Sequence, residues 1–160
     1  MSFEILVLCA GNIGRSPLAA AMLRRGLAVE LGVSEDQLEV SGVGVGSAGT
    51  GAPEGHQASS RGEAYAIARG LDLSSHRAAQ LTETELEAAD VIYCMDRQQL
   101  AAIAELAPAA LMRAELLAGE GKEIPDPHYE SDGFFRRVAE QIEEAVAARI
   151  PELLERIESS

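Results

Sequence analysis

The order of apolar and polar positions along the chain predicts strands that alternate with helices. Residues 4–10, EILVLCA, form a short and almost wholly apolar run, which is typical of a strand buried on both faces of a parallel sheet. A second strand is predicted in VSGVGVGSAGT (40–50), which breaks into a glycine-rich loop, and a third in DVIYCM (90–95). Strands and helices in this alternation indicate an α/β sandwich around a mostly parallel sheet.

Helical spacing follows the first of these runs. The first helix is predicted to have Ser16 as its N-cap and Pro17 at its first helical position, because both residue types are favoured there. Four apolar side chains recur at helical spacing and are expected to face the sheet: Leu18, Ala21, Met22 and Val29.

Further helices are expected along the rest of the chain. One covers about residues 57–69 and ends at Gly70, which suits a left-handed C-terminal cap, and another begins near Arg97. The last is long, with a bend expected at Pro151. Six apolar residues share one face of this last helix: Phe134, Val138, Ile142, Val146, Ile150 and Leu153.

Length and charge narrow the possible classes of protein. A chain of 160 residues is expected to form one domain, residues 1–160, with a core of its own. Its net charge of −13 repels nucleic acid and anionic membranes, so neither is expected as a partner. No apolar run is long enough to cross a bilayer, and the first residues lack the basic region of a signal peptide. Two distant cysteines without an export signal favour a reducing cytoplasm.

The loop CAGNIGRS follows the first predicted strand, at the edge of the sheet where α/β proteins bind ligands. A strand-to-helix turn of small residues aims its backbone N–H groups inward, and the helix that follows adds its positive end, so the turn suits an anion. Gly11 and Gly14 allow a close approach of the backbone, and Asn12 tolerates a left-handed conformation. The residues expected to bind phosphate are Ala10, Gly11, Asn12, Ile13, Gly14, Arg15 and Ser16.

Cys9 and Arg15 give this loop its chemistry. The planar guanidinium of Arg15 can hold two phosphate oxygens at once. The same positive surroundings favour the thiolate, the nucleophilic form of cysteine, at Cys9. A lone cysteine at a strand end is more often a small buried hydrophobe, and Cys94, which has no such loop, is expected in the core. The spacing of Cys9, five residues and then Arg-Ser favours a phosphate cradle with a nucleophile at its floor.

The segment from Cys9 to Pro17 resembles the signature loop of the low-molecular-weight protein tyrosine phosphatases, Cys-X-Gly-Asn-X-Cys-Arg-Ser-Pro. SAGT at Ser47, HRAAQL at His76, ADVIYCMD ending at Asp96 and PDP at Asp126 follow in the family's order. The resemblance implies a flavodoxin-like three-layer sandwich, with a four-stranded parallel sheet flanked by helices. It also implies that phosphotyrosine monoesters are hydrolysed through a phosphocysteine intermediate, without a metal or another cofactor.

The resemblance assigns catalytic roles to three residues. Cys9 would attack phosphorus, while Arg15 and the loop amides stabilise the phosphate oxygens. Asp126 would protonate the leaving oxygen and then activate water, and Pro127 fixes the backbone after it. Asp132 is the alternative acid, although SDG is more typical of a turn or a helix cap.

Other residues are expected to support the loop or to line the pocket. The resemblance implies that Asn12, Ser16, Ser47 and His76 hold the cradle rigid, with Ser16 also donating a hydrogen bond to the Cys9 sulfur. Substrate walls are expected at Ile13 and Tyr129, while His56 and His128 receive no role. Gly14 departs from the signature, where many members have a second cysteine, and the loop after Ser47 lacks a large aromatic residue.

The sequence leaves several functions open. A protein arginine phosphatase of the same family is the nearest alternative, although the bulky apolar Ile13 suits an aryl ring better than a guanidinium. An arsenate reductase would need more cysteines than the chain has. A phosphocysteine carrier or a non-catalytic phosphate-binding module would explain the cradle, but Arg15 and Asp126 favour hydrolysis. The expected partner is a phosphotyrosine-containing protein, for which a tyrosine kinase is one candidate, and the sequence does not indicate an oligomeric state.

Overall fold

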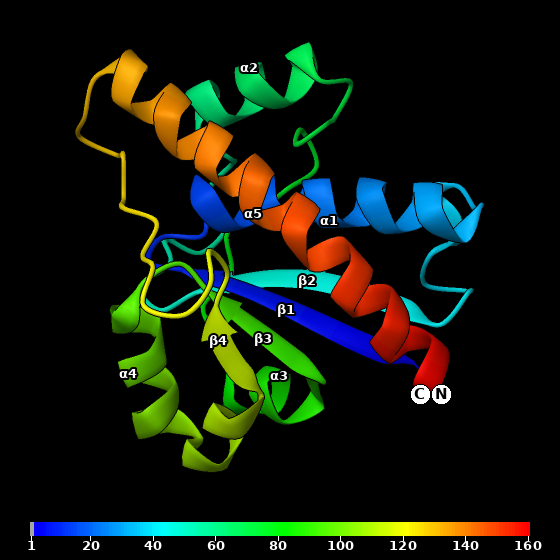
Figure 1. Cartoon of the computed structure of the whole chain (residues 1–160). Coiled ribbons are helices and arrows are strands. Elements are labelled where there is room, and N and C mark those ends of the chain that lie inside the picture. Colours follow the sequence, from blue (N-terminus) through cyan, green and yellow to red (C-terminus); the bar gives the residue numbers. More distant parts are fainter. Residues whose placement is uncertain (1) are drawn as a thin grey trace.

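The apolar runs form a sheet of four parallel strands in the computed structural model, which describes residues 2–160 (Figure 1). The strands are β1 (Phe3–Cys9), β2 (Val43–Gly49), β3 (Val91–Cys94) and β4 (Ala114–Leu116), and their order in the sheet is β2-β1-β3-β4. The register places Cys9 beside Gly49 on one neighbouring strand and Leu8 beside Cys94 on the other. β1 is therefore an inner strand, and its carboxyl end lies between the carboxyl ends of β2 and β3.

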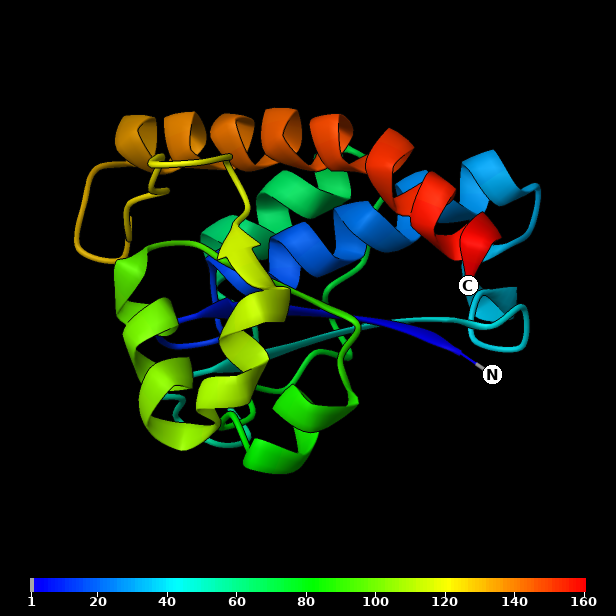
Figure 2. The ribbon, with the colours of Figure 1, turned by 60° about the horizontal axis from the view of Figure 1, so that its bottom comes forward.

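Helices cover both faces of this sheet, as Figure 2 shows. On one side lie α1 (Arg15–Leu31), α2 (Ser60–Ala68) and α5 (Asp132–Ser159), and on the other lie α3 (Glu83–Ala88) and α4 (Arg97–Leu106). Short 3₁₀ helices, η1 (Glu35–Gln37) and η2 (Pro108–Arg113), precede β2 and β4. This is the flavodoxin-like three-layer arrangement that the family resemblance implies, so that expectation is confirmed.

Alternation along the strands divides the core into two clusters. Ile5 and Val7 of β1 pack with α1 and α5, whereas Leu6 and Leu8 pack with α3 and α4. Because successive side chains of a strand point to opposite faces, a strand buried on both sides must be apolar throughout. This explains the continuous apolar run in β1.

Two expectations for the first helix are wrong. The N-cap is Gly14 rather than Ser16, because the Ser16 hydroxyl is engaged with Cys9 and Asn12 instead of capping the helix. Val29 does not face the sheet: it is 67% exposed and borders a groove between α1 and α5, while Leu27 and Ala28 take the buried positions of that turn. The predicted strands and the helices α2, α4 and α5 are present with shifted ends.

The last helix covers the sheet along its length. It continues through Pro151 and bends in its final turns (Figure 2), as expected where proline removes one helical hydrogen bond. Its six predicted apolar residues all belong to the core cluster or pack against it. The segment before this helix, which carries Asp126, is thereby fixed at its far end.

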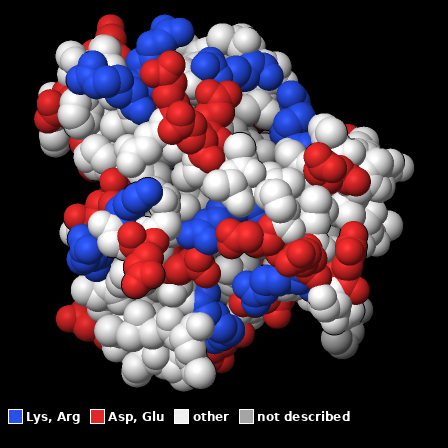
Figure 3. All heavy atoms as spheres, viewed as in Figure 1, with Lys and Arg blue, Asp and Glu red and all other residues white. Residues whose placement is uncertain are grey.

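Charges of both signs are mixed over the face of the molecule seen in Figure 3. Although the net charge is −13, the acidic side chains on that face do not form one continuous patch. Within residues 2–160, no helix combines the length and the apolar character that crossing a membrane requires.

Candidate active site

The residues predicted to bind phosphate, 10–16, here termed the phosphate loop, connect the end of β1 to the first turn of α1. Cys9 is the last residue of β1, and the helix begins six residues later at Arg15. The loop is tied to the segment after β2, because Thr50 N donates to the carbonyl oxygen of Cys9 at 3.1 Å and Gly51 N donates to that of Ala10 at 2.9 Å. The positive end of α1 therefore faces the region next to the Cys9 sulfur.

Two hydrogen bonds converge on the Cys9 sulfur. The Asn12 backbone N–H donates to Sγ at 3.2 Å, and the Ser16 hydroxyl lies 3.0 Å from the same atom. Asn12 Nδ2 donates to Ser16 Oγ at 2.8 Å, which leaves the hydroxyl hydrogen of Ser16 free to point at the sulfur. Both contacts stabilise a negatively charged thiolate.

Asn12 is the centre of the support for this loop. It is fully buried, and its φ of 56° is in the left-handed region that asparagine tolerates better than most residues. Its Nδ2 also donates to Ser47 Oγ at 3.0 Å, and its Oδ1 accepts from Ala79 N at 2.9 Å. His76 Nε2 donates to the carbonyl oxygen of Asn12 at 2.7 Å. Because a carbonyl oxygen can only accept, this imidazole nitrogen carries a proton. The four residues predicted to support the loop thus meet in one network.

Gly49 lets β2 pack directly against the loop. A Cβ atom at this position would lie 2.6 Å from the carbonyl oxygen of Ala10 and 3.0 Å from the Asn12 nitrogen. Such distances are shorter than van der Waals contact, so a larger residue would push the loop away. The glycine of SAGT is therefore required by the close approach of two backbones.

Arg15 is 3% exposed and is held from one side. Its Nη1 donates to Asp96 Oδ2 at 2.8 Å and to the carbonyl oxygen of Ile124 at 2.7 Å. Within residues 2–160, its Nε and Nη2 donate no hydrogen bond, so one edge of the guanidinium remains available. Burial with a charge partner keeps this arginine in one orientation.

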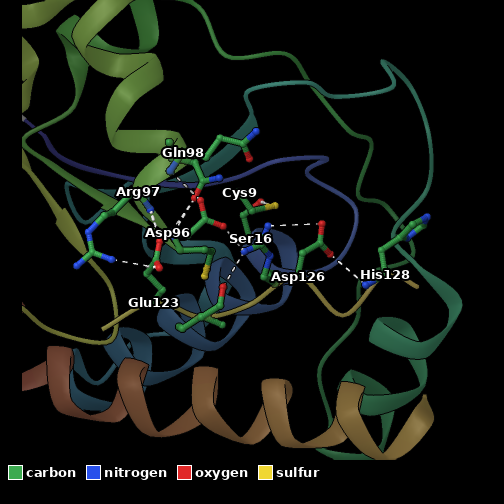
Figure 4. A network of polar contacts seen from close by, with 12 residues as sticks. Cys9, Ser16, Asp96, Arg97, Gln98, Glu123, Asp126 and His128 are labelled. Carbon is green, nitrogen blue, oxygen red and sulfur yellow. Dashed lines mark hydrogen bonds and ion pairs between the residues drawn. The ribbon is translucent and has the colours of Figure 1, made fainter. Parts of the chain in front are cut away.

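Asp126 reaches the same place from the segment between β4 and α5. Its Oδ2 lies 3.8 Å from Arg15 Nη2, and its Oδ1 accepts from the His128 backbone N–H at 3.1 Å. Figure 4 shows Cys9, Ser16 and Asp126 close together, with Asp96 approaching from the start of α4. Asp126 is 53% exposed, which leaves room for a substrate beside it.

A cavity of about 320 Å³ lies between these groups. Its lining includes Cys9, Arg15 and Asp126, together with Ile13 and Tyr129, the two predicted substrate walls. Tyr129 is 93% exposed, and its ring makes an edge contact with that of His128 at 4.5 Å between centroids. The structure therefore places the three predicted catalytic residues and both predicted walls at one cavity.

Comparisons with known proteins show the family of this chain. The family model described as "Low molecular weight phosphotyrosine protein phosphatase" matches residues 4–159. The chain belongs to this family. The prediction of an enzyme of the phosphoric monoester hydrolase class is confirmed with it.

Individual relatives of this low-molecular-weight phosphatase resemble it over nearly their full lengths. A probable low molecular weight protein-tyrosine-phosphatase EpsP from Ralstonia nicotianae is 36% identical over 93% of this chain and 94% of its own. The tyrosine phosphatase Wzb from Escherichia coli K30, solved with sulphate, is 32% identical with a TM-score of 0.81, over 96% of this chain and 99% of its own. The YwlE arginine phosphatase from Geobacillus stearothermophilus is 26% identical with a TM-score of 0.80, over 96% and 94%.

Two residues near the cavity, Asp96 and Arg61, could not be assigned a role from the sequence. The sequence pattern marks Asp96 only as the end of a strand motif, yet its side chain accepts a hydrogen bond from Arg15 and caps α4 by accepting from Gln98 N at 3.0 Å. Its position directly after a buried strand was the available signal. Arg61 of α2 lines the cavity, and no sequence pattern distinguishes it from other surface arginines.

Other candidates lie away from the cavity. Cys94 is fully buried on β3, as expected. Asp132 is the first residue of α5 and pairs with Arg61 at 3.4 Å, with its side chain 94% exposed. Among residues 2–160, no cluster of three or more histidine, cysteine, aspartate or glutamate side chains is arranged to hold a metal ion.

Proposed function

We propose that this phosphatase hydrolyses phosphotyrosine monoesters on proteins through a phosphocysteine intermediate at Cys9, without a metal. The observation that carries the proposal is the Cys9 sulfur at the floor of the cavity, with hydrogen bonds from Asn12 and Ser16 and with Arg15 and Asp126 beside it. A nucleophile, an anion cradle and an acid in one cavity are the parts that this reaction needs.

In the first step, the Cys9 thiolate attacks phosphorus and the bond from phosphorus to the tyrosyl oxygen breaks. The electron pair of that bond goes to the oxygen, and Asp126 donates a proton to it, so the tyrosine leaves neutral. The free edge of Arg15 and the backbone N–H groups of residues 10–16 other than that of Asn12, which donates to the sulfur, stabilise the three equatorial oxygens. Asp96 holds the guanidinium of Arg15 in one orientation, so the arginine needs little movement when the substrate binds and reacts.

In the second step, water attacks the phosphorus of phosphocysteine. Asp126, now a carboxylate, accepts a proton from that water, and the bond between sulfur and phosphorus breaks. The products are inorganic phosphate and the Cys9 thiolate. The hydrogen bonds from the Asn12 amide and the Ser16 hydroxyl stabilise the sulfur as it leaves.

A protein arginine phosphatase is the second candidate, because structural neighbours of this chain include the YwlE arginine phosphatase from Geobacillus stearothermophilus. Ile13 favours the phosphotyrosine proposal, since its apolar side chain at the cavity suits an aryl ring and offers no hydrogen bond to a guanidinium. A phosphotyrosine-bearing kinase is one protein substrate consistent with this choice. We also propose that the enzyme works in a reducing cytoplasm, where a catalytic thiol survives.

Turnover of p-nitrophenyl phosphate and of a phosphotyrosine peptide, each with a chelator present, tests the proposed function. The wild type should release phosphate, Cys9→Ser should not, and acid quenching during turnover should trap phosphate on a Cys9 peptide. Phosphate binding without turnover would favour a non-catalytic binding module. Stable phosphorylation of Cys9 without release of phosphate would favour a phosphocysteine carrier.

A further inference from the structure

The segment that carries Asp126 is exposed except at Pro127, which is buried near Leu18 of α1 and Phe135 of α5. Residues 125–130, here termed the acid loop, contain no helix or strand and lie between Ile124 and Ser131, the N-cap of α5. Inside the loop, Glu130 N donates to the carbonyl oxygen of Pro127 at 3.0 Å, and His128 N donates to Asp126. These short-range bonds shape the loop, and the buried Pro127 side chain anchors it at one point, but neither gives it a hydrogen bond to another element.

Arg61 supplies the hydrogen bonds that connect the acid loop to another element. Its Nη2 donates to the carbonyl oxygens of Pro127 at 2.8 Å and His128 at 3.2 Å, and its Nη1 donates to that of Glu130 at 2.8 Å. Within residues 2–160, Arg61 makes all the hydrogen bonds that join the acid loop to other elements. The remaining polar contact is the 3.8 Å ion pair between Asp126 and Arg15.

The other end of this connection is the phosphate loop. Ser59, the N-cap of α2, donates its backbone N–H to the carbonyl oxygen of Ile13 at 2.7 Å, and its hydroxyl accepts from Gly62 N at 3.1 Å. Arg61 follows two residues later on the first turn of α2. The start of α2 therefore makes hydrogen bonds to the phosphate loop through Ser59 and to the acid loop through Arg61.

Arginine suits this position because of its geometry. A planar guanidinium can donate to three carbonyl oxygens at once, which the single ammonium of lysine cannot match in the same arrangement. The guanidinium also lies 4.8 Å from the centroid of the Phe135 ring on α5, which limits its movement. Its side chain is 29% exposed, so its removal leaves the three carbonyls accessible to water rather than buried and unpaired.

We propose that Arg61 is a positioning residue that holds Asp126 at the correct distance from Cys9 and the leaving group. The inference rests on the proposed role of Asp126 as the general acid and deepens it. A general acid is effective only when it is placed within hydrogen-bond reach of the leaving oxygen. The phosphate cradle has its own support, so the loss of Arg61 should affect proton transfer and leave phosphate binding intact.

The test compares Arg61→Gln with Arg69→Gln, which removes the same charge from the end of α2, where Arg69 binds Glu143 on α5. For phenyl phosphate, which has a poor leaving group, Arg61→Gln should lower kcat/KM by about 10- to 100-fold. The decrease for p-nitrophenyl phosphate should be smaller, and competitive inhibition by inorganic phosphate should be unchanged. Arg61→Lys should restore only part of the loss, and Arg69→Gln should behave as the wild type.

An Asp126→Asn background and hydrogen–deuterium exchange complete the experiment. Arg61→Gln should cause no further loss when Asp126 is already Asn, and it should speed amide exchange in residues 125–131. Equal losses in both backgrounds, weaker phosphate inhibition or unchanged exchange would overturn the positioning role. If Asp126→Asn itself had no effect on poor leaving groups, the proposed function would fail instead, while the exchange data would still report on the loop.

Discussion

Cys9 and Cys94 end adjacent strands but lie on opposite faces of the sheet. The register pairs Cys94 with Leu8, so the Cys94 side chain shares the face of Leu8 and packs in the cluster under α3 and α4. Cys9 belongs to the cluster on the other face. The sheet backbone therefore separates the two thiols.

Oxidation of Cys9 should be hard to reverse. Peroxide converts the thiolate to a sulfenic acid, which is rescued when a nearby thiol displaces water to form a disulfide. Cys94 is on the wrong face to do so, so prolonged peroxide should give sulfinic or sulfonic acid at Cys9. Peptide mapping should find no Cys9–Cys94 disulfide, and dithiothreitol should not restore activity. Full recovery through that disulfide would contradict the prediction.

Gly14→Cys should make the same loss reversible. A Cβ at position 14 has no neighbouring atom within 4 Å, and Gly14 lines the same cavity as Cys9. The new side chain therefore fits without a clash, and a disulfide with Cys9 requires the two side chains to move towards each other. Recovery of activity by dithiothreitol after peroxide should be larger in this variant than in the wild type.

Cys94 should stay unmodified in the folded enzyme. Burial raises the pKa of the Cys94 thiol to about 12, from an ordinary 9.0, so the thiol keeps its proton through neutral and mildly alkaline pH. Because the folded pKa is the higher one, its contribution to stability is complete below pH 9 and declines as pH rises towards 12. Iodoacetamide at pH 8 should label Cys9 alone, with protection by phosphate, and both cysteines only after unfolding.

Gly49→Ala should impair the active site, while Gly46→Ala on the same strand should not. The Cβ at position 49 would press on Ala10 and Asn12, whereas a Cβ at position 46 meets nothing within 4 Å. Binding of inorganic phosphate, measured by calorimetry, should weaken several-fold in the first variant and remain unchanged in the second. Equal phosphate affinities in the two variants would show that the loop absorbs the added methyl group.

Asp126→Ala should reduce turnover of phenyl phosphate by about 10²–10⁴-fold, the usual contribution of general acid catalysis. The loss should be smaller for p-nitrophenyl phosphate, because its leaving group needs less help from a proton. Steady-state kinetics on both esters gives the comparison, with Asp132→Ala as the matched control on the neighbouring helix. A larger loss in Asp132→Ala would move the acid role to that residue.

Ile13→Ser should lower the preference for phosphotyrosine over phosphoarginine. The wild type is expected to favour phosphotyrosine peptides, because Ile13 gives the substrate ring an apolar contact at the cavity. The ratio of kcat/KM for matched peptides measures the preference. A wild-type enzyme with equal or higher kcat/KM on phosphoarginine would support the second candidate function.

The phosphate loop could be predicted from sequence because its chemistry is local. Cys9, the small residues and Arg15 lie within seven positions, and each residue type has a physical reason to be there. Asp96 and Arg61 could not be predicted as partners, since their contacts join positions 81 and 66–69 residues apart. The strand β4 has three residues and α3 has six, too few for a periodic pattern to emerge.

The support of Asn12 has a consequence for how this protein folds. Its partners Ser47, His76 and Ala79 are 35, 64 and 67 residues away in the chain. A fragment that contained the whole signature loop would therefore lack the cradle, because the loop acquires its shape only when distant segments have docked. Phosphate is therefore expected to bind the native state and not partly folded chains. At a hundred times its dissociation constant, it should stabilise the entire molecule against unfolding by about 2.7 kcal/mol.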